Sequence, residues 1–217
     1  MISKEMYRTI CDISFIGFCK INKRILFSAN NINGLFEYNI QEKTLNILTF
    51  FNYRHDAKDL FIDCIQFNDS LYMIPLCADS LVEVNLNTFD MVSYPLDKSY
   101  SHNSYHFQGA FITGTNLWMY PRQYRALVCF DLRKKEYHFF TQPVNLITPY
   151  IKHIKWTLFP DYILDNNILW FCFCNSNMLL AVNLTEECST ELFTIDTNEM
   201  GADFLEFDGH NFWLCDL

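Results

Sequence analysis

The chain has 217 residues, of which 50% are hydrophobic and 19% are charged, a balance that excludes a mainly disordered protein. The formal net charge of −9 argues against a duplex-binding protein, because nonspecific affinity for phosphates comes from clustered Lys and Arg. Aromatic residues reach 17%, whereas Gly and Pro number only six each, and this composition favours stacked β-sheets. We therefore expect a globular protein that binds no nucleic acid.

The first residues and the cysteines indicate where the chain is expected to reside. Lys4, Glu5, Arg8 and Asp12 interrupt the stretch in which a signal peptide would need apolar residues. No window approaches the roughly 18 apolar residues of a membrane helix, so we expect no membrane partner. Most of the nine cysteines lie in apolar strand patterns, which favours reduced core thiols. These features predict a cytoplasmic protein.

A repeat runs through the chain, and it begins with strand-like segments that end in Asn or Asp followed by Ile or Leu. The four copies are LFEYNI from Leu35, LVEVNL from Leu81, LVCFDL from Leu127 and LLAVNL from Leu179. An apolar anchor lies fourteen residues before each Asn or Asp. The anchors are Ile25, Leu71, Leu117 and Leu169, and a fifth copy starts at Phe212. The anchor-to-anchor distances are 46, 46, 52 and 43 residues, which indicates duplicated structural units.

Each unit is predicted to contain four short strands, which we name A to D. Strand A surrounds a Phe ten residues before the anchor, B contains the anchor, C ends in the Asn or Asp, and D follows. The Phe positions are Phe15, Phe61, Phe107 and Phe159. Apolar residues alternate in strand C, as at Phe36, Tyr38 and Ile40, which favours strand over helix. The Asn or Asp is expected to cap the turn between C and D by accepting a backbone N–H.

Radially arranged units of 40 to 50 residues are typical of the β-propeller superfamily, which this chain resembles along nearly its whole length. The resemblance implies an all-β fold of four-stranded antiparallel blades in a single domain, residues 1–217. The chain lacks the paired glycines of kelch and the Gly-His to Trp-Asp spacing of WD40 repeats, and VNLNT from Val84 loosely resembles degenerate quinoprotein-like blades. The expected blades span residues 13–50, 59–97, 105–142 and 156–196, with a half blade at 201–217.

The half blade leaves two interpretations of the ring. An incomplete ring, or a fragment of a longer chain, is favoured, and an irregular five-bladed closure is the alternative. Glu5 to Ile10 could supply one missing strand but not two. An unpaired sheet edge invites pairing with another chain, so self-association through the last blade is a further expectation.

The resemblance also implies where a ligand would bind, since D to A and B to C connections share one rim of a propeller. Basic and aromatic residues gather in these connections although the chain is acidic overall. The candidate ligand-binding residues are Tyr53, Arg54, His55, Tyr105, His106, Arg122, Tyr124, Arg125, His153, Lys155 and Trp156.

Three functions compete for this rim. A non-catalytic protein-interaction platform ranks first, because it demands no special residues. A module for an anionic or sugar ligand is the second, since guanidinium groups pair with carboxylate or phosphate. A lyase or hydrolase that uses rim histidines is the third, although no known catalytic motif supports it. No phosphate-binding glycine loop or complete zinc-ligand set occurs, so we expect neither a cofactor nor a metal.

Overall fold

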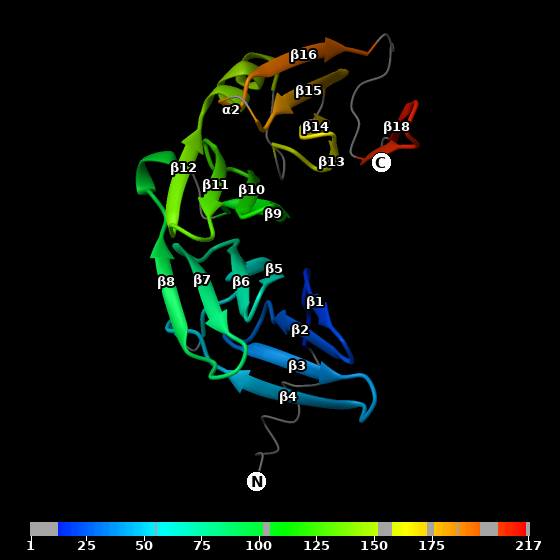
Figure 1. Cartoon of the computed structure of the whole chain (residues 1–217). Helices are drawn as coiled ribbons and strands as arrows, with labels where there is room; N and C mark the ends of the chain where they lie inside the picture. The colour runs from blue at the N-terminus through cyan, green and yellow to red at the C-terminus, as the bar shows by residue number, and fades with distance from the viewer. Residues whose placement is uncertain are drawn as a thin grey trace. The chain divides into compact units, whose positions relative to one another are not determined.

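The computed structural model describes residues 13–54, 56–101, 105–151, 158–172, 176–185, 187–195 and 204–215. Its strands form four antiparallel four-stranded sheets and one two-stranded sheet, each built from strands that are consecutive in the chain (Figure 1). We name the sheets blades 1 to 4 and the half blade. This architecture confirms the predicted all-β fold of four blades and half of a fifth.

The strands lie within each blade in the order A, B, C, D. Blade 1 contains β1 (Cys19–Ile21), β2 (Arg24–Ser28), β3 (Leu35–Asn39) and β4 (Thr44–Thr49). Blade 2 contains β5 (Phe61–Phe67), β6 (Ser70–Pro75), β7 (Ser80–Asn85) and β8 (Met91–Pro95). Blade 3 contains β9 (Phe107–Thr113), β10 (Asn116–Pro121), β11 (Leu127–Asp131) and β12 (Glu136–Phe140). Blade 4 contains β13 (Tyr162–Asp165), β14 (Ile168–Cys172), β15 (Met178–Asn183) and β16 (Thr190–Thr194), and the half blade contains β17 (Phe204–Phe207) and β18 (Phe212–Cys215).

Two details differ from the sequence prediction. Phe61 and Phe107 begin strand A of their blades, but Phe15 and Phe159 precede β1 and β13. Pro160 follows Phe159 and has no N–H to donate to a neighbouring strand. The long 52-residue period contains a helix, α2 (Gln142–Ile147), followed by the 3-10 turn η2 (Thr148–Tyr150). Another 3-10 turn, η1 (Lys98–Tyr100), precedes blade 3.

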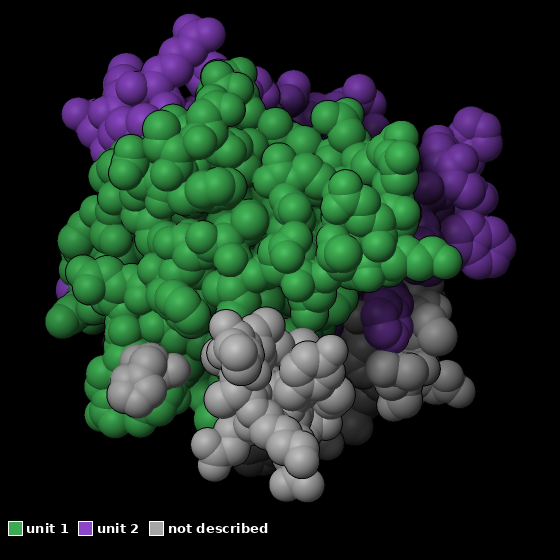
Figure 2. Space-filling view, turned by 90° about the horizontal axis from the view of Figure 1, so that it is seen from below, with its two compact units in different colours: residues 1–98 green, residues 99–217 purple. Residues whose placement is uncertain are grey.

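The chain divides into two compact units, residues 1–98 and 99–217, which Figure 2 shows in green and purple. The first unit holds blades 1 and 2, and the second holds blades 3 and 4 with the half blade.

Neighbouring blades bury apolar side chains against each other. In the first unit, Leu26 and Leu35 of blade 1 cluster with Phe61, Leu71 and Met73 of blade 2. The thiol of Cys64 on β5 also donates to the carbonyl oxygen of Leu26 on β2, at 3.3 Å. Blade 2 therefore stacks on one face of blade 1.

The second unit repeats this stacking. Trp118 and Leu127 of blade 3 cluster with Phe171 and Leu180 of blade 4, and α2 adds Ile147 to the same core. On its other face, blade 4 buries Cys172 and Leu179 together with Leu205 of the half blade. Both faces of blade 4 thus contribute apolar residues to a core.

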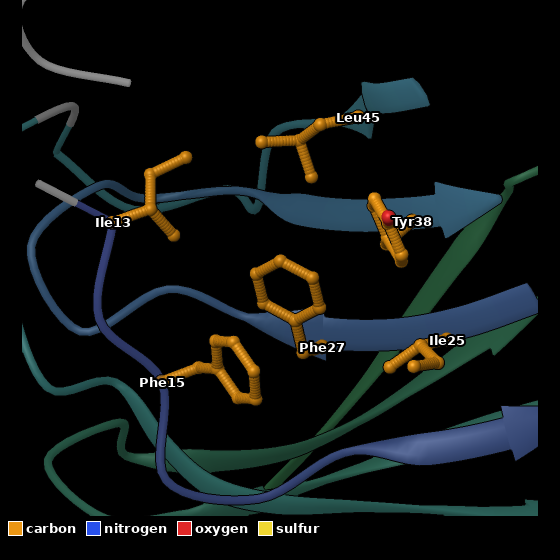
Figure 3. Close-up of a pocket in the computed structure, with 6 residues that line it drawn as sticks. All are labelled: Ile13, Phe15, Ile25, Phe27, Tyr38 and Leu45. Carbon is orange, nitrogen blue, oxygen red and sulfur yellow. The ribbon is translucent and has the colours of Figure 1, made fainter. Parts of the chain in front are cut away.

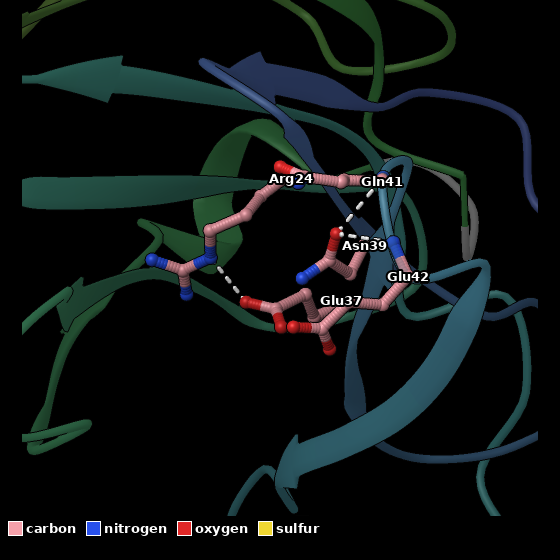
Figure 4. A network of polar contacts seen from close by, with 5 residues as sticks. All are labelled: Arg24, Glu37, Asn39, Gln41 and Glu42. Atoms are coloured by element: carbon pink, nitrogen blue, oxygen red, sulfur yellow. Dashed lines mark hydrogen bonds and ion pairs between the residues drawn. The ribbon is translucent and has the colours of Figure 1, made fainter.

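The repeated Asn or Asp caps the turn from strand C to strand D in each complete blade, through two backbone N–H groups in blades 1 to 3 and through that of Thr185 in the described part of blade 4. In blade 1, the Oδ1 of Asn39 accepts the backbone N–H groups of Gln41 and Glu42, at 3.0 and 3.1 Å (Figure 4). The equivalent acceptors in the other blades are Asn85, Asp131 and Asn183. These bonds confirm the predicted capping role of the repeated Asn or Asp.

The residue that follows this Asn or Asp joins the two turns of its blade. Its backbone N–H donates to a carbonyl oxygen of the A to B turn in all four blades. The pairs are Ile40 to Lys23, Leu86 to Asp69, Leu132 to Thr115 and Leu184 to Asn167, at 2.8 to 2.9 Å. The A to B and C to D turns of one blade therefore form a single bonded end.

Asn85 offers a test of the turn. Asn85→Ala removes the acceptor for the N–H groups of Asn87 and Thr88, so we expect it to lower the free energy of unfolding by about 1 kcal/mol. Asn85→Asp keeps an acceptor oxygen and serves as the control, with stability near wild type. Urea unfolding measures both variants, and an alanine variant as stable as wild type would contradict the capping role.

A partly buried carboxyl group lies in strand A of blade 2. Gly17 packs closely over Asp63, such that a Cβ at Gly17 would lie 2.5 Å from the Asp63 Cα. Burial raises the pKa of Asp63 to about 6, although its Oδ1 accepts the backbone N–H of Cys64, which acts in the opposite direction. The ionised form is therefore the less favourable one in the folded protein.

Asp63 makes stability depend on pH in a defined window. The folded state holds the proton of Asp63 more tightly than the unfolded state does. The contribution of this proton to the free energy of unfolding is therefore complete below the ordinary pKa of 3.8 and is lost as pH rises through about 6. Asp63→Asn should therefore exceed wild type in stability at pH 8 by about 2 kcal/mol, and the difference should vanish near pH 4. Chemical denaturation at both pH values measures this difference. A pH-independent difference would show that the carboxyl charge is not its cause.

Candidate functional site

In the first unit, the D to A connection after β4 carries two of the predicted site residues, Tyr53 and Arg54. A buried amide that the sequence analysis did not single out fixes this segment. The Nδ2 of Asn33 donates to the carbonyl oxygens of Phe51, Tyr53 and Arg54, at 3.0 to 3.1 Å. Asn33 is only 2% exposed. It positions the loop from the neighbouring B to C connection of the same blade.

The side chains of this loop have partners of their own. The hydroxyl of Tyr53 donates to Asp79 Oδ1 at 2.9 Å, and its ring contacts Phe61 edge-on. Burial, and then the carboxylate of Asp79, raises the pKa of Tyr53 to about 12. Arg54 is exposed and makes a two-bond ion pair with Asp56, at 3.0 and 2.7 Å. Carboxylates therefore accompany both predicted ligand-binding side chains.

In the second unit, the structure brings Tyr105 and Arg122 together. The Arg122 guanidinium carbon lies over the ring of Tyr105, 5.0 Å from the ring centre. A guanidinium in this position is attracted by the negative face of the aromatic ring. Tyr105, from the connection that precedes β9, is 40% exposed. Arg125, which lies with Arg122 in the B to C connection between β10 and β11, is exposed too. We name Tyr105, Arg122 and Arg125 the blade 3 rim.

Backbone hydrogen bonds hold the blade 3 rim in place. The carbonyl oxygen of His106 accepts the N–H groups of Arg122, Gln123 and Tyr124, at 2.8 to 3.3 Å. The Arg122 carbonyl in turn accepts the N–H of Leu158, and the Tyr100 carbonyl accepts that of Arg125. Blade 2 has the same arrangement, in which Leu60 accepts from Leu76, Cys77 and Ala78. The repeat thus supplies a rigid turn, and blade 3 places arginine side chains on it.

The structure places two predicted ligand-binding residues in the core instead of on the surface. Tyr124 is fully buried, with its ring against Phe107 and Phe139, and His106 is 8% exposed with its ring edge-on to Tyr124. Both side chains therefore belong to the packed core next to the backbone of the blade 3 rim.

The remaining predicted site residues fall outside the described part of the chain. These are His55, His153, Lys155 and Trp156. They stay predictions.

The first unit also carries an apolar groove that the sequence analysis did not identify. It lies on the face of blade 1 opposite the one that packs on blade 2, and it measures about 290 Å³ (Figure 3). Its lining residues are Ile13, Phe15, Ile25, Phe27, Tyr38 and Leu45. Ile25 and Phe27 occupy the places that Leu71 and Met73 hold in blade 2, where they are buried against blade 1. The groove is therefore a blade face of the kind that stacks on another blade.

A cluster of metal ligands and a membrane-spanning helix are both absent from the described residues. Among them, no three His, Cys, Asp or Glu side chains gather as metal ligands would. In the same ranges, no helix combines the length and the apolar character needed to cross a bilayer.

The arrangement of the strands is similar to that of solved propellers. The extracellular domain of a candidate one component system from B. thetaiotaomicron matches with a TM-score of 0.60 and 13% identity over 91% of this chain and 24% of that chain. The nidogen/laminin complex matches with a TM-score of 0.59 and 7% identity, over 94% of this chain and 72% of that one. The WD40 repeats of RRP9 match with a TM-score of 0.57 and 9% identity, over 84% of this chain and 52% of that one. The fold is of the β-propeller type.

These similarities concern the fold. The chain spans about a quarter of the length of the bacterial domain and about half that of RRP9. No family model matches the chain, and no curated protein matches it. At identities of 7 to 13%, function has to be argued from the residues of this chain.

The bond between Tyr53 and Asp79 provides a test of the loop in the first unit. Tyr53→Phe removes the hydroxyl, so we expect the free energy of unfolding at pH 7 to fall by about 1 kcal/mol. The contribution is complete below pH 10 and is lost as pH rises through about 12, because ionisation of the phenol removes the donor. Denaturant titration measures the loss. Tyr105→Phe is the control, because its ring face carries the contact with Arg122, and equal losses in both variants would contradict the assignment.

Proposed function

We propose that this protein is a non-catalytic binding platform and that the blade 3 rim receives a carboxylate-bearing segment of a protein partner. The observation that carries the proposal is the contact between the exposed ring of Tyr105 and the half-buried Arg122, which lies on a turn held by backbone bonds. Arg and Tyr are the residue types that contribute most often to the energetic centre of protein interfaces.

The geometry of the guanidinium supports this choice of partner. The guanidinium carbon of Arg122 lies over the ring of Tyr105, and its N–H groups are arranged in one plane around that carbon. A planar guanidinium is the side chain that matches both oxygens of a carboxylate, which favours a carboxylate-bearing partner for this rim. Arg125, from the same B to C connection, adds an exposed cation.

The rigidity of the turn also favours binding. The three N–H bonds to the His106 carbonyl and the buried ring of Tyr124 hold the backbone of the rim before a partner arrives. A surface that is already ordered loses less conformational entropy on association.

A paired capture experiment tests the proposal. Immobilised wild type, Arg122→Ala and Arg133→Ala are exposed to the same cell extract, and captured proteins are identified by mass spectrometry. Arg133 is a matched control, since it removes the same charge from the C to D turn of the same blade. We expect at least one captured protein that is retained equally by wild type and by Arg133→Ala. The captured amount of this protein should fall at least tenfold with Arg122→Ala, and the purified partner should bind purified wild type directly.

Two further outcomes complete the test. Arg122→Lys keeps the charge but loses the flat stacking surface, so we expect intermediate retention of the same partner. Identical captured sets for wild type and Arg122→Ala would overturn the proposal. Citrate serves as a probe for the small-anion alternative: a melting temperature that citrate raises for wild type but not for Arg122→Ala, without a protein partner, would favour a ligand-binding module.

A further inference from the structure

Two cysteines meet at the interface between blades 1 and 2. Cys19 lies on β1 and Cys64 on β5, which are the A strands of their blades. Cys64 belongs to the apolar core that the two blades share, and Cys19 packs against the same core. Neither cysteine is in a disulfide in this structure. Both side chains therefore point into one interface between stacked sheets.

Hydrogen bonds place these two side chains next to each other. Cys19 lies opposite Leu26 in the antiparallel register of β1 and β2. The carbonyl oxygen of Leu26 accepts the thiol of Cys64, at 3.3 Å. Burial raises the pKa of Cys64 well above its ordinary value, and a hydrogen bond from the backbone of Cys19 acts in the opposite direction. The Cys64 sulfur therefore lies beside both Cys19 and the cross-strand partner of Cys19.

The two thiols differ in their access to solvent. Cys64 is 3% exposed, whereas Cys19 is half-buried. An oxidant in solution therefore reaches Cys19 first, and Cys64 is the neighbouring thiol that an oxidised Cys19 meets. Burial also raises the pKa of the Cys19 thiol above its ordinary value. Because the thiolate is the reactive form, the reaction at neutral pH is slow and needs sustained exposure to the oxidant.

This pair of thiols carries a modification that the proposed binding role does not use. We propose that a peroxide converts Cys19 and Cys64 into a disulfide that joins blade 1 to blade 2 without distorting their interface. The bond is reversible, because a dithiol reductant restores both thiols.

The chemistry proceeds in two steps. The Cys19 thiolate attacks one oxygen of hydrogen peroxide, the O–O bond breaks, and the second oxygen leaves as water with the proton of the thiol. This step leaves a sulfenic acid on Cys19. The Cys64 sulfur then attacks the Cys19 sulfur, the S–O bond breaks, and a second water leaves with the Cys64 proton. The two thiols are thereby oxidised to one disulfide, and the peroxide is reduced to two waters.

The second unit holds another pair of cysteines that serves as an internal comparison. Cys129 on β11 and Cys188 belong to one core, and they are 4% and 1% exposed. The same peroxide should leave both thiols reduced while the protein is folded, because each is almost fully buried. The disulfide in the first unit thus depends on the combination of contact and access.

Peptide mapping tests the proposal. The folded full chain is treated with hydrogen peroxide, the remaining thiols are blocked with N-ethylmaleimide, and the digest is mapped by mass spectrometry without reduction. We expect a cross-linked peptide that joins Cys19 to Cys64 and that dithiothreitol separates. Cys129 and Cys188 should carry the blocking group.

Two variants serve as test and matched control. Cys19→Ser should lose the cross-linked peptide. Cys77→Ser should keep it, since Cys77 is also a half-buried cysteine of the first unit. The proposal is overturned if wild-type Cys19 is recovered only as a thiol or a sulfinic acid, or if it is joined to a cysteine other than Cys64.

Urea unfolding tests whether the bond fits the native interface. A disulfide restricts the unfolded chain, so oxidised wild type should unfold at a higher urea concentration than reduced wild type. Cys19→Ser treated with the same peroxide controls for the oxidation of methionine and should show no such rise. A midpoint that oxidation lowers in wild type alone would mean that the bond distorts the interface, and it would contradict the proposal.

Discussion

The structure depends on one constraint, which is that its sheets are apolar on both faces. A sheet of this kind cannot present either face to water without cost, so each blade has to be stacked between others. In the first unit Leu26 and Leu35 meet this requirement against blade 2, and in the second unit Leu180 meets it against blade 3. The requirement also explains the groove of blade 1, where Ile25 and Phe27 lie on the face opposite blade 2. The cores and the apolar groove thus have one physical origin.

Much of this fold could be predicted from the sequence because its signals are local. The fourteen-residue spacing from the anchor to the Asn or Asp sets the pairing of strands B and C, and the same register follows in all four blades. The capping bonds of Asn85 and Asp131 are formed within three residues. Signals of this range do not depend on the rest of the chain. The helix α2 escaped prediction because its six residues give too short a pattern within a long connection.

The candidate site could be predicted only in part, since exposure depends on packing between loops. Arg122 and Tyr105 belong to different connections of blade 3, and only the folded turn brings them into contact. Tyr124 lies two residues from Arg122 in the same connection, yet its ring enters the core because the bonds to the His106 carbonyl turn the backbone. Asn33 could not be recognised either, because its three carbonyl partners lie about twenty residues further along the chain. Composition predicts which residue types reach a rim, whereas backbone turns decide which of them face solvent.

The bond that joins the two turns of each blade has a consequence for the evolution of such a chain. The bonds from Leu86 to Asp69 and from Leu132 to Thr115 join the two turns through groups of the same blade. A unit that carries its own closing bonds can be copied, lengthened or shortened in its other connections without disturbing that end. Repeat proteins couple mainly through adjacent units, so such changes spread only to the next interface. The anchors of blades 3 and 4 lie six residues further apart than the 46-residue period, and the extra length falls in the connection at the opposite end of the blade, which contains α2.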